Sequence, residues 1–152
     1  MSQRSGHIRR LALCSVGVAA ACKLGLPTQP VGPVGSLAGT WDIEKYLLQS
    51  VDNPAVQSDL IAGGLRGSLD LASSGSFTIH ISFPNDPPVT QTGLITVHKD
   101  TLRYALSGDS AQVYTYTHDS TSMSWSLVNP IRLDITSDGK AESVRAFLTW
   151  KR

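Results

Sequence analysis

The feature that most constrains this fold is a series of short segments in which apolar and polar residues alternate, each followed by turn-forming residues. The clearest segment runs from Phe77 to Phe83, where four apolar residues alternate with three polar ones. A period of two places the two sets of side chains on opposite faces of a β-strand. Similar segments recur to the C-terminus, separated by Ser-, Gly-, Asp- and Pro-rich turns. The chain from residue 36 onward is therefore predicted to be all β.

The predicted strands follow one another through tight turns, without helical segments long enough to connect parallel strands. This excludes a parallel α/β fold and indicates an antiparallel meander of about eight or nine strands. Closure into an up-and-down β-barrel removes both exposed edges. A two-sheet sandwich stays open as the alternative, because alternation does not reveal closure. Gly93, inside the segment 89–97, is expected to mark a bend or bulge.

One segment of the domain carries helix signals instead. Asn53 is suited to the N-cap, Pro54 to the first helical position, and Gly63-Gly64 to the stop. We expect a helix of about two turns over residues 55–62, directly after the first strand. It would either cap the mouth of a ligand-binding barrel or plug the end of a filled barrel as ordinary core.

The first 21 residues have the architecture of a secretory signal peptide. Basic residues end at Arg9-Arg10, an apolar run follows, and small residues precede Cys22. The run is too short to span a bilayer as a mature helix, which takes about 20 apolar residues. The chain is therefore expected to be exported. Cys14 would leave with the leader, so the mature domain would have no disulfide and would depend on its core.

The residues Ala19-Ala20-Ala21-Cys22 resemble the lipobox of bacterial lipoproteins, in which the Cys is lipidated and becomes the first mature residue. The resemblance implies attachment to a membrane of the bacterial cell envelope through Cys22. By the same resemblance, Lys23 favours the outer membrane if the cell is Gram-negative. Plain secretion, with Cys22 as an incidental thiol, is the alternative. Residues 22–35 are rich in Pro and Gly and are predicted to form a flexible tether before the domain at 36–152.

Charge argues against nucleic acid as a partner. The formal net charge of the whole chain is +1, from 13 basic and 12 acidic residues. Arg4, Arg9 and Arg10 lie in the predicted leader, and their removal leaves ten basic residues against 12 acidic ones. The remainder has no Lys/Arg cluster to neutralise phosphates, so no nucleic-acid binding is expected.

Gly39 and Trp41, at the start of the first predicted strand, resemble the G-x-W signature of the lipocalins and of short bacterial lipocalin-like barrels. The resemblance covers residues 39–152 and implies a barrel that the Trp closes at one end. It also implies that a basic residue of a late strand, Arg152 or Arg145, packs on the Trp ring through a cation–π contact. The second lipocalin motif, Thr-Asp-Tyr, is missing: the nearest run, 116–119, reads Tyr-Thr-His-Asp.

No catalytic or metal-binding motif such as G-x-S-x-G or H-E-x-x-H occurs. The serines fall mostly in turns and at outward strand positions. His80, His98 and His118 are spaced as solvated side chains rather than as metal ligands. We therefore expect no enzyme activity, no metal and no other cofactor.

A ligand-binding wall is predicted from residues that combine apolar surface with polar groups, as small-molecule pockets do. An eight-stranded barrel is just wide enough to be filled by side chains or to hold one small ligand, so the same residues are alternatively core. The candidates are Tyr104, Tyr114, Tyr116, Met123 and Trp125.

Three functions remain open on the sequence. The first is an exported, lipid-anchored barrel that binds a small apolar or amphipathic molecule. The second is a barrel that binds a protein partner through its tether, as implied by a resemblance to bacterial alkaline proteinase inhibitors. The third is a structural envelope lipoprotein without a soluble ligand.

Overall fold

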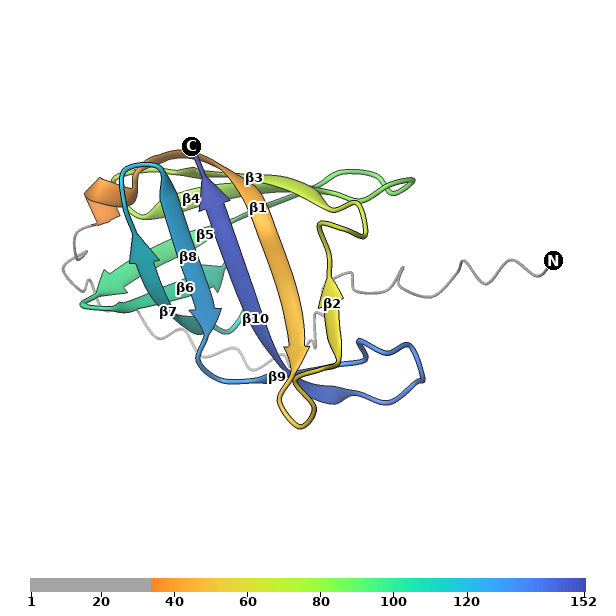
Figure 1. Ribbon diagram of the computed structural model, residues 1–152. Helices are drawn as coiled ribbons and strands as arrows, with labels where there is room; N and C mark the ends of the chain where they lie inside the picture. The colour runs from red at the N-terminus through yellow and green to blue at the C-terminus, as the bar shows by residue number, and fades with distance from the viewer. Residues whose placement is uncertain (1–33) are drawn as a thin grey trace.

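A computed structural model describes residues 34–152, which form one antiparallel sheet of ten strands. The sheet closes on itself where β1 pairs with β10 (Figure 1). The barrel wall runs in the order β1-β3-β4-β5-β6-β7-β8-β10, while β2 and β9 flank the far ends of β1 and β10. Closure rules out the sandwich and confirms the antiparallel barrel. The elements are η2 (Val34–Leu37), β1 (Gly39–Ser50), β2 (Gln57–Asp59), β3 (Arg66–Leu71), β4 (Ser76–Ser82), β5 (Val89–His98), β6 (Thr101–Leu106), β7 (Gln112–His118), β8 (Ser122–Leu127), β9 (Ile131–Leu133) and β10 (Glu142–Lys151).

The core fills the barrel interior with the apolar half of each alternating segment. In β8, for example, Met123, Trp125 and Leu127 are buried, while the serines between them are half-buried. Strand β10 buries every second residue from Val144 to Trp150 in the same way. The period of two therefore predicts correctly which residues of these strands face inward.

The predicted helix over residues 55–62 is wrong. Its place is taken by β2, which pairs with β1 from Leu47 to Gln49, and by turns that run up to Gly64. The reason lies in β1, because β3 pairs only with its first residues, as far as Asp42. The later backbone N–H and C=O groups of β1 need another partner, and β2 supplies it. A helix of two turns has little stability of its own to compete with that pairing.

Gly93 is not a bulge, since the pairing of β5 with β4 and with β6 is continuous through it. A Cβ atom at Gly93 would lie 2.7 Å from the ring of Phe77 and would clash with the carbonyl oxygen of Ala105. The glycine thus leaves room for the Phe77 ring. The register shift of the wall lies in β1 instead, between Ile43 and Lys45.

One end of the barrel is closed by η2, whose Val34 and Leu37 are fully buried. Trp41 is also fully buried, and its indole Nε1 donates a hydrogen bond of 2.8 Å to the carbonyl oxygen of Leu37. The turn and the indole together plug the barrel end. Val34 and Gly35, which the sequence assigned to the tether, belong to this plug.

Arg152 completes the closed end. Its guanidinium carbon lies 3.9 Å from the centroid of the Trp41 ring, and its Nη2 donates to the carbonyl oxygen of Ala38 at 2.6 Å. Gly39 adopts a φ of +137°, and a Cβ there would lie 3.3 Å from Arg152. A glycine is favoured for both reasons. This is the arrangement that the lipocalin resemblance implied for Gly39, Trp41 and Arg152, whereas Arg145 is exposed on β10.

The predicted signal peptide, the lipid attachment at Cys22 and the tether up to residue 33 lie outside the described residues. They stay predictions. Within residues 34–152, no helix has the length and apolar content of a membrane span.

Candidate functional site

An aromatic cluster lies inside the barrel, built by inward-facing side chains of five strands: Phe77, Tyr104, Tyr114, Trp125 and Trp150. Phe77 stacks on Tyr104 with ring centroids 4.8 Å apart. Trp125 is the centre of the cluster, with centroid distances of 6.2 Å to Tyr104, 5.7 Å to Tyr114 and 5.4 Å to Trp150. Tilted and edge-on contacts of this kind are favourable arrangements of aromatic rings.

Two hydrogen-bond donors of the aromatic cluster have no partner. The indole Nε1 atoms of Trp125 and Trp150 are buried and make no hydrogen bond within the described structure. The two side chains are only 2% and 1% exposed. A buried donor without an acceptor costs about 1–3 kcal/mol, and such groups are few in native proteins. Both indoles are thus free to donate to an acceptor that the described residues do not supply.

Three tyrosine hydroxyls are further hydrogen-bonding groups at this site, two of them within the cluster, on Tyr104 and Tyr114, and one beside it, on Tyr46. Burial raises the pKa of Tyr46. Burial also raises the pKa values of Tyr104 and Tyr114, and the nearby Tyr46 hydroxyl raises both further. The three hydroxyls therefore stay protonated at neutral pH. Tyr114 already donates to the Oε1 atom of Gln112 at 2.6 Å.

Of the five residues predicted to line the wall, the structure brings Tyr104, Tyr114 and Trp125 together in the aromatic cluster. Met123 is fully buried between His118 and Trp150 on the neighbouring strands, and it packs as core. Tyr116 is half-buried and stacks on the His118 ring at 5.9 Å rather than on the cluster.

Sequence reasoning missed Tyr46 and Trp150 as site residues. Trp150 had a usable signal, because it continues the inward series of β10. Tyr46 had none: the bulge between Ile43 and Lys45 changes which residues of β1 face inward. Trp41 and Tyr46 both point into the barrel, although simple alternation from Trp41 would turn Tyr46 outward.

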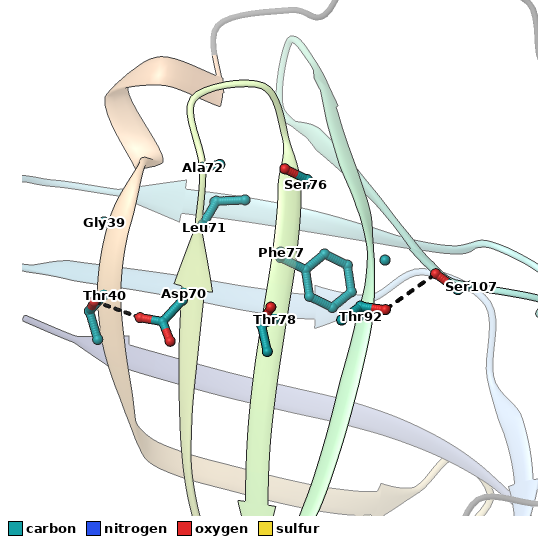
Figure 2. A pocket seen from close by; sticks show the side chains of 11 residues that line it. Gly39, Thr40, Asp70, Leu71, Ala72, Ser76, Phe77, Thr78, Thr92 and Ser107 are labelled. Atoms are coloured by element: carbon teal, nitrogen blue, oxygen red, sulfur yellow. Dashed lines mark hydrogen bonds between the residues drawn. The ribbon is translucent and has the colours of Figure 1, made fainter.

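Two shallow hollows lie on the outer face of the barrel. The first is lined by polar side chains that cross four neighbouring strands and continue to Ser107 (Figure 2). Thr40 Oγ1 donates to Asp70 Oδ1 at 2.6 Å, and the hydroxyls of Thr92 and Ser107 lie 3.5 Å apart. These polar groups largely satisfy one another, and Leu71 and Phe77 supply the bulky apolar part of the lining.

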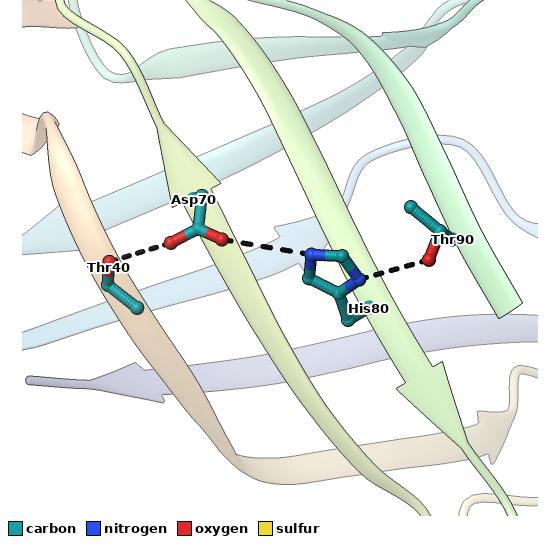
Figure 3. Close-up of polar contacts among 4 residues, drawn as sticks. All are labelled: Thr40, Asp70, His80 and Thr90. Carbon is teal, nitrogen blue, oxygen red and sulfur yellow. Dashed lines mark hydrogen bonds and ion pairs between the residues drawn. The ribbon is translucent and has the colours of Figure 1, made fainter. Parts of the chain in front are cut away.

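A chain of polar contacts links Thr40, Asp70, His80 and Thr90 across β1, β3, β4 and β5 (Figure 3). His80 Nε2 lies 3.9 Å from Asp70 Oδ2, and His80 Nδ1 lies 3.0 Å from Thr90 Oγ1. The residue types are those of a nucleophile, a base and an acid. The side chains of His80 and Asp70 are each 51% exposed, so the water-excluded setting in which such a triad works is missing.

Three carboxylates gather where the loop after β9 meets the start of β10. Oxygen atoms of Asp134, Asp138 and Glu142 lie within 4.8 Å of one another and are the described groups nearest to a metal-ligand set. Asp134 accepts hydrogen bonds from the backbone N–H groups of Asp138 and Gly139. Glu142 accepts one from the Thr136 hydroxyl at 2.7 Å. The carboxylates therefore lie close together because they hold the backbone and side chains of this loop in place through hydrogen bonds.

Comparison with known proteins gives likenesses to solved structures and no match of any other kind. No protein-family model matches the chain, and no curated protein matches it. Among solved structures, the chain is similar to one titled "Structure of EF1p2_mFAP2b bound to DFHBI", with 17% sequence identity and a TM-score of 0.45. The match covers 79% of this chain and 96% of the other. A likeness at this level carries no argument about function.

Proposed function

We propose that the barrel binds a small aromatic or amphipathic molecule at the aromatic cluster. The observation that carries the proposal is the pair of buried indole N–H groups, on Trp125 and Trp150, that have no acceptor. A ligand carbonyl or ring nitrogen would satisfy one of them and recover much of the cost of burying it. The large aromatic surfaces around the two indoles supply the apolar wall that such pockets have.

The chemistry of the interior limits the ligand. Among the buried residues of the described structure, Ser50 is the one polar or charged side chain apart from the aromatic residues. The polar side-chain atoms of the cluster and its surroundings are the indole N–H groups of Trp125 and Trp150 and the hydroxyls of three tyrosines, Tyr46, Tyr104 and Tyr114. An uncharged, largely planar molecule with one or two acceptor atoms fits this environment, since a localised charge would be buried without a counter-ion.

Room for the ligand is expected at the end of the barrel away from η2. Tyr46 and Tyr104 are half-buried there, and so are Ile81, near the end of β4, and Phe83, directly after it. Half-buried side chains change rotamer at small cost, and their rotation would make room for a ligand beside Trp125.

A titration with Nile red, a neutral planar dye with one carbonyl acceptor, tests this function in the full chain. We expect saturable one-to-one binding with quenching of tryptophan fluorescence. Trp150→Phe removes a donor but keeps most of the ring, and should weaken binding about tenfold, the equivalent of one hydrogen bond. Tyr116→Phe, outside the aromatic cluster, is the control and should bind as the parent does. Non-saturable binding, or equal affinities for all three proteins, would refute the proposal.

We also propose that the chain is exported and anchored to a bacterial envelope membrane through Cys22, with the residues up to 33 as tether. The support is the basic, apolar and small-residue order of the first 22 residues. Cys22→Ser should move the protein from the membrane fraction to the soluble fraction, while Cys14→Ser should not. Equal membrane retention of both variants would contradict lipid attachment at Cys22.

A binding role rather than catalysis is part of the same proposal. The exposure of His80 and Asp70 supports it, because the polar chain on the outer face lacks a dry, enclosed setting.

A further inference from the structure

The barrel wall has a seam between β1 and β3. The two strands pair from Gly39↔Leu71 to Asp42↔Ser68 and no further. Strand β3 begins two residues before that last rung, where Arg66 and Gly67 pair only with β4. Beyond Asp42, β1 passes through its bulge and takes β2 as its next neighbour from Leu47 onward. The stretch between Asp42 and Leu47 therefore has no ladder on its β3 side.

The second outer hollow, of about 420 Å³, opens at this seam. Its lining has an apolar part, the floor, made by Ile43, Gly67 and Ile81. The polar part, the rim, includes Asp42, Arg66, Ser68, His80 and Ser82. A Cβ atom on Gly67 would lie 3.5 Å from Ile43 Cγ2 and 3.7 Å from Ile81 Cγ1. Gly67 lies on the inner face of β3, between the buried Leu65 and Leu69, so its missing side chain leaves space beside the two isoleucines. Both isoleucines are only half-buried.

The floor of this hollow adjoins the aromatic cluster. Ile43 is the direct partner of Trp150 across the β1–β10 ladder, and side chains in that relation lie in contact. Ile43 and Ile81 both pack against the buried core. Trp150 carries one of the two unpartnered indole N–H groups. One layer of side chains therefore separates the outer hollow from the proposed binding site.

Where β1 and β3 no longer pair, the turn that precedes β3, residues 60–65, borders the seam in place of a strand ladder. Arg66 Nη1 donates to the carbonyl oxygens of Ile61 and Leu65 at 3.2 and 2.7 Å. Pro84 packs on Gly64 so closely that a Cβ atom there would meet its ring. Displacing this turn would widen the seam without breaking the β1–β3 or β3–β4 ladders.

We propose that the seam is a lateral portal, through which an apolar or amphipathic molecule reaches the aromatic cluster. Its apolar body would pass over Gly67 between Ile43 and Ile81, and a polar head would rest at Arg66 and Asp42. The role as a portal rests on the proposed binding function. The accessibility of the floor to an apolar molecule does not, and it is tested separately.

Thiol labelling tests whether the floor admits an apolar molecule. The full chain with Cys14→Ser and Cys22→Ser would carry a single cysteine, from Ile43→Cys, and react with N-phenylmaleimide. Ile79→Cys, buried on β4 and facing inward, is the matched control. We expect Ile43→Cys to react at least tenfold faster, and to slow at least tenfold when Ser82→Trp covers the hollow. Equal rates at the two cysteines, or no effect of Ser82→Trp, would overturn the accessibility of the floor.

Stopped-flow kinetics with Nile red test the passage itself. Ser82→Trp should slow association and dissociation about tenfold each and leave the dissociation constant unchanged, because a blocked path affects both directions equally. Ser68→Trp, on the same rim, is a second blocking variant in case the first folds poorly. Thr78→Trp, beside the first hollow, is the control and should keep the parent rates.

The outcomes separate the two proposals. Binding of Nile red with unchanged rates in both blocking variants would refute the portal and leave the binding function standing. Failure of Nile red to bind would refute the binding function and with it the portal, whereas the labelling rates would still decide whether the floor is accessible.

Discussion

Replacing Arg152 with alanine removes two interactions at the closed end of the barrel at once. The guanidinium lies 3.9 Å from the Trp41 ring centroid and donates to the Ala38 carbonyl oxygen at 2.6 Å. A cation–π contact contributes about 0.5–1 kcal/mol at an exposed site, and a hydrogen bond from a charged group about 1.5–3 kcal/mol when sheltered. Arg152 is exposed, so the lower end of both ranges applies. We expect a loss of about 2 kcal/mol in the free energy of unfolding.

Urea denaturation followed by tryptophan fluorescence measures this loss directly. For a domain of this size, about 2 kcal/mol corresponds to a fall in Tm of roughly 8 °C. Arg152→Lys keeps the charge but loses the planar fork, and should retain about half of the stabilisation. Arg145→Ala, also exposed and on β10, is the matched control and should change the stability by less than about 0.5 kcal/mol.

The reasoning would be refuted if Arg152→Ala and Arg145→Ala had the same stability. In that case the stacking of Arg152 on Trp41 would contribute nothing measurable to the free energy of unfolding. The end of the barrel would then be held closed by η2 and the buried Trp41 indole alone.

Three further changes test other parts of the structure. Gly93→Val should cost at least about 3 kcal/mol in a urea titration, because its Cβ would meet a carbonyl oxygen and the Phe77 ring. Asp119→Asn should remove part of the acid sensitivity of unfolding, since backbone hydrogen bonds in its turn lower the pKa of this carboxyl. That stabilisation is present above about pH 4 and is lost as the pH falls through the lowered pKa. Tyr46, Tyr104 and Tyr114, whose pKa values are raised, should resist ionisation in the folded barrel. Stability should fall as the pH rises above about 10, where the unfolded phenols ionise, and absorbance at 295 nm would follow the change.

Each of these changes has a control or an outcome that would contradict it. Gly35→Val meets no atom within 4 Å of its Cβ and should be mild, so an equally large loss there would contradict the packing argument for Gly93. An unchanged acid limb of the stability curve in Asp119→Asn would contradict the role assigned to the hydrogen bonds in its turn. If the phenols ionised near pH 10 before the barrel unfolded, their placement in the interior would be wrong.

The barrel was predictable because its signals are local. Alternation from Phe77 to Phe83, or from Met123 to Leu127, needs only neighbouring residues to show which side chains face inward. Short turns then require antiparallel neighbours. The helix failed for the opposite reason, since Asn53 and Pro54 are correct local cap signals. The need of β1 for a partner beyond Asp42 is set by the register with β3, which no local pattern contains.

Local alternation predicted some residues of the candidate site, while others depend on strand register and could not be predicted. Tyr104, Tyr114 and Trp125 lie on strands of unbroken alternation, and the sequence places them in the wall. Tyr46 follows a bulge whose position depends on how β1 meets β10, so its inward direction was hidden. The seam at Gly67 arises where two ladders end at different residues, and it becomes visible only once all the neighbours of β1 are known.

The pairing of β1 with β10 has a consequence for how the protein is made. The first and last strands of the domain are partners along most of their length, so the barrel closes only when its C-terminal ten-residue strand is available. A nascent or truncated chain that ends before Glu142 exposes the edges of both β1 and β8, which are templates for pairing with other chains. Folding dominated by such distant partners is slow. Folding after the whole chain has been released from the ribosome would suit this topology better than folding during synthesis.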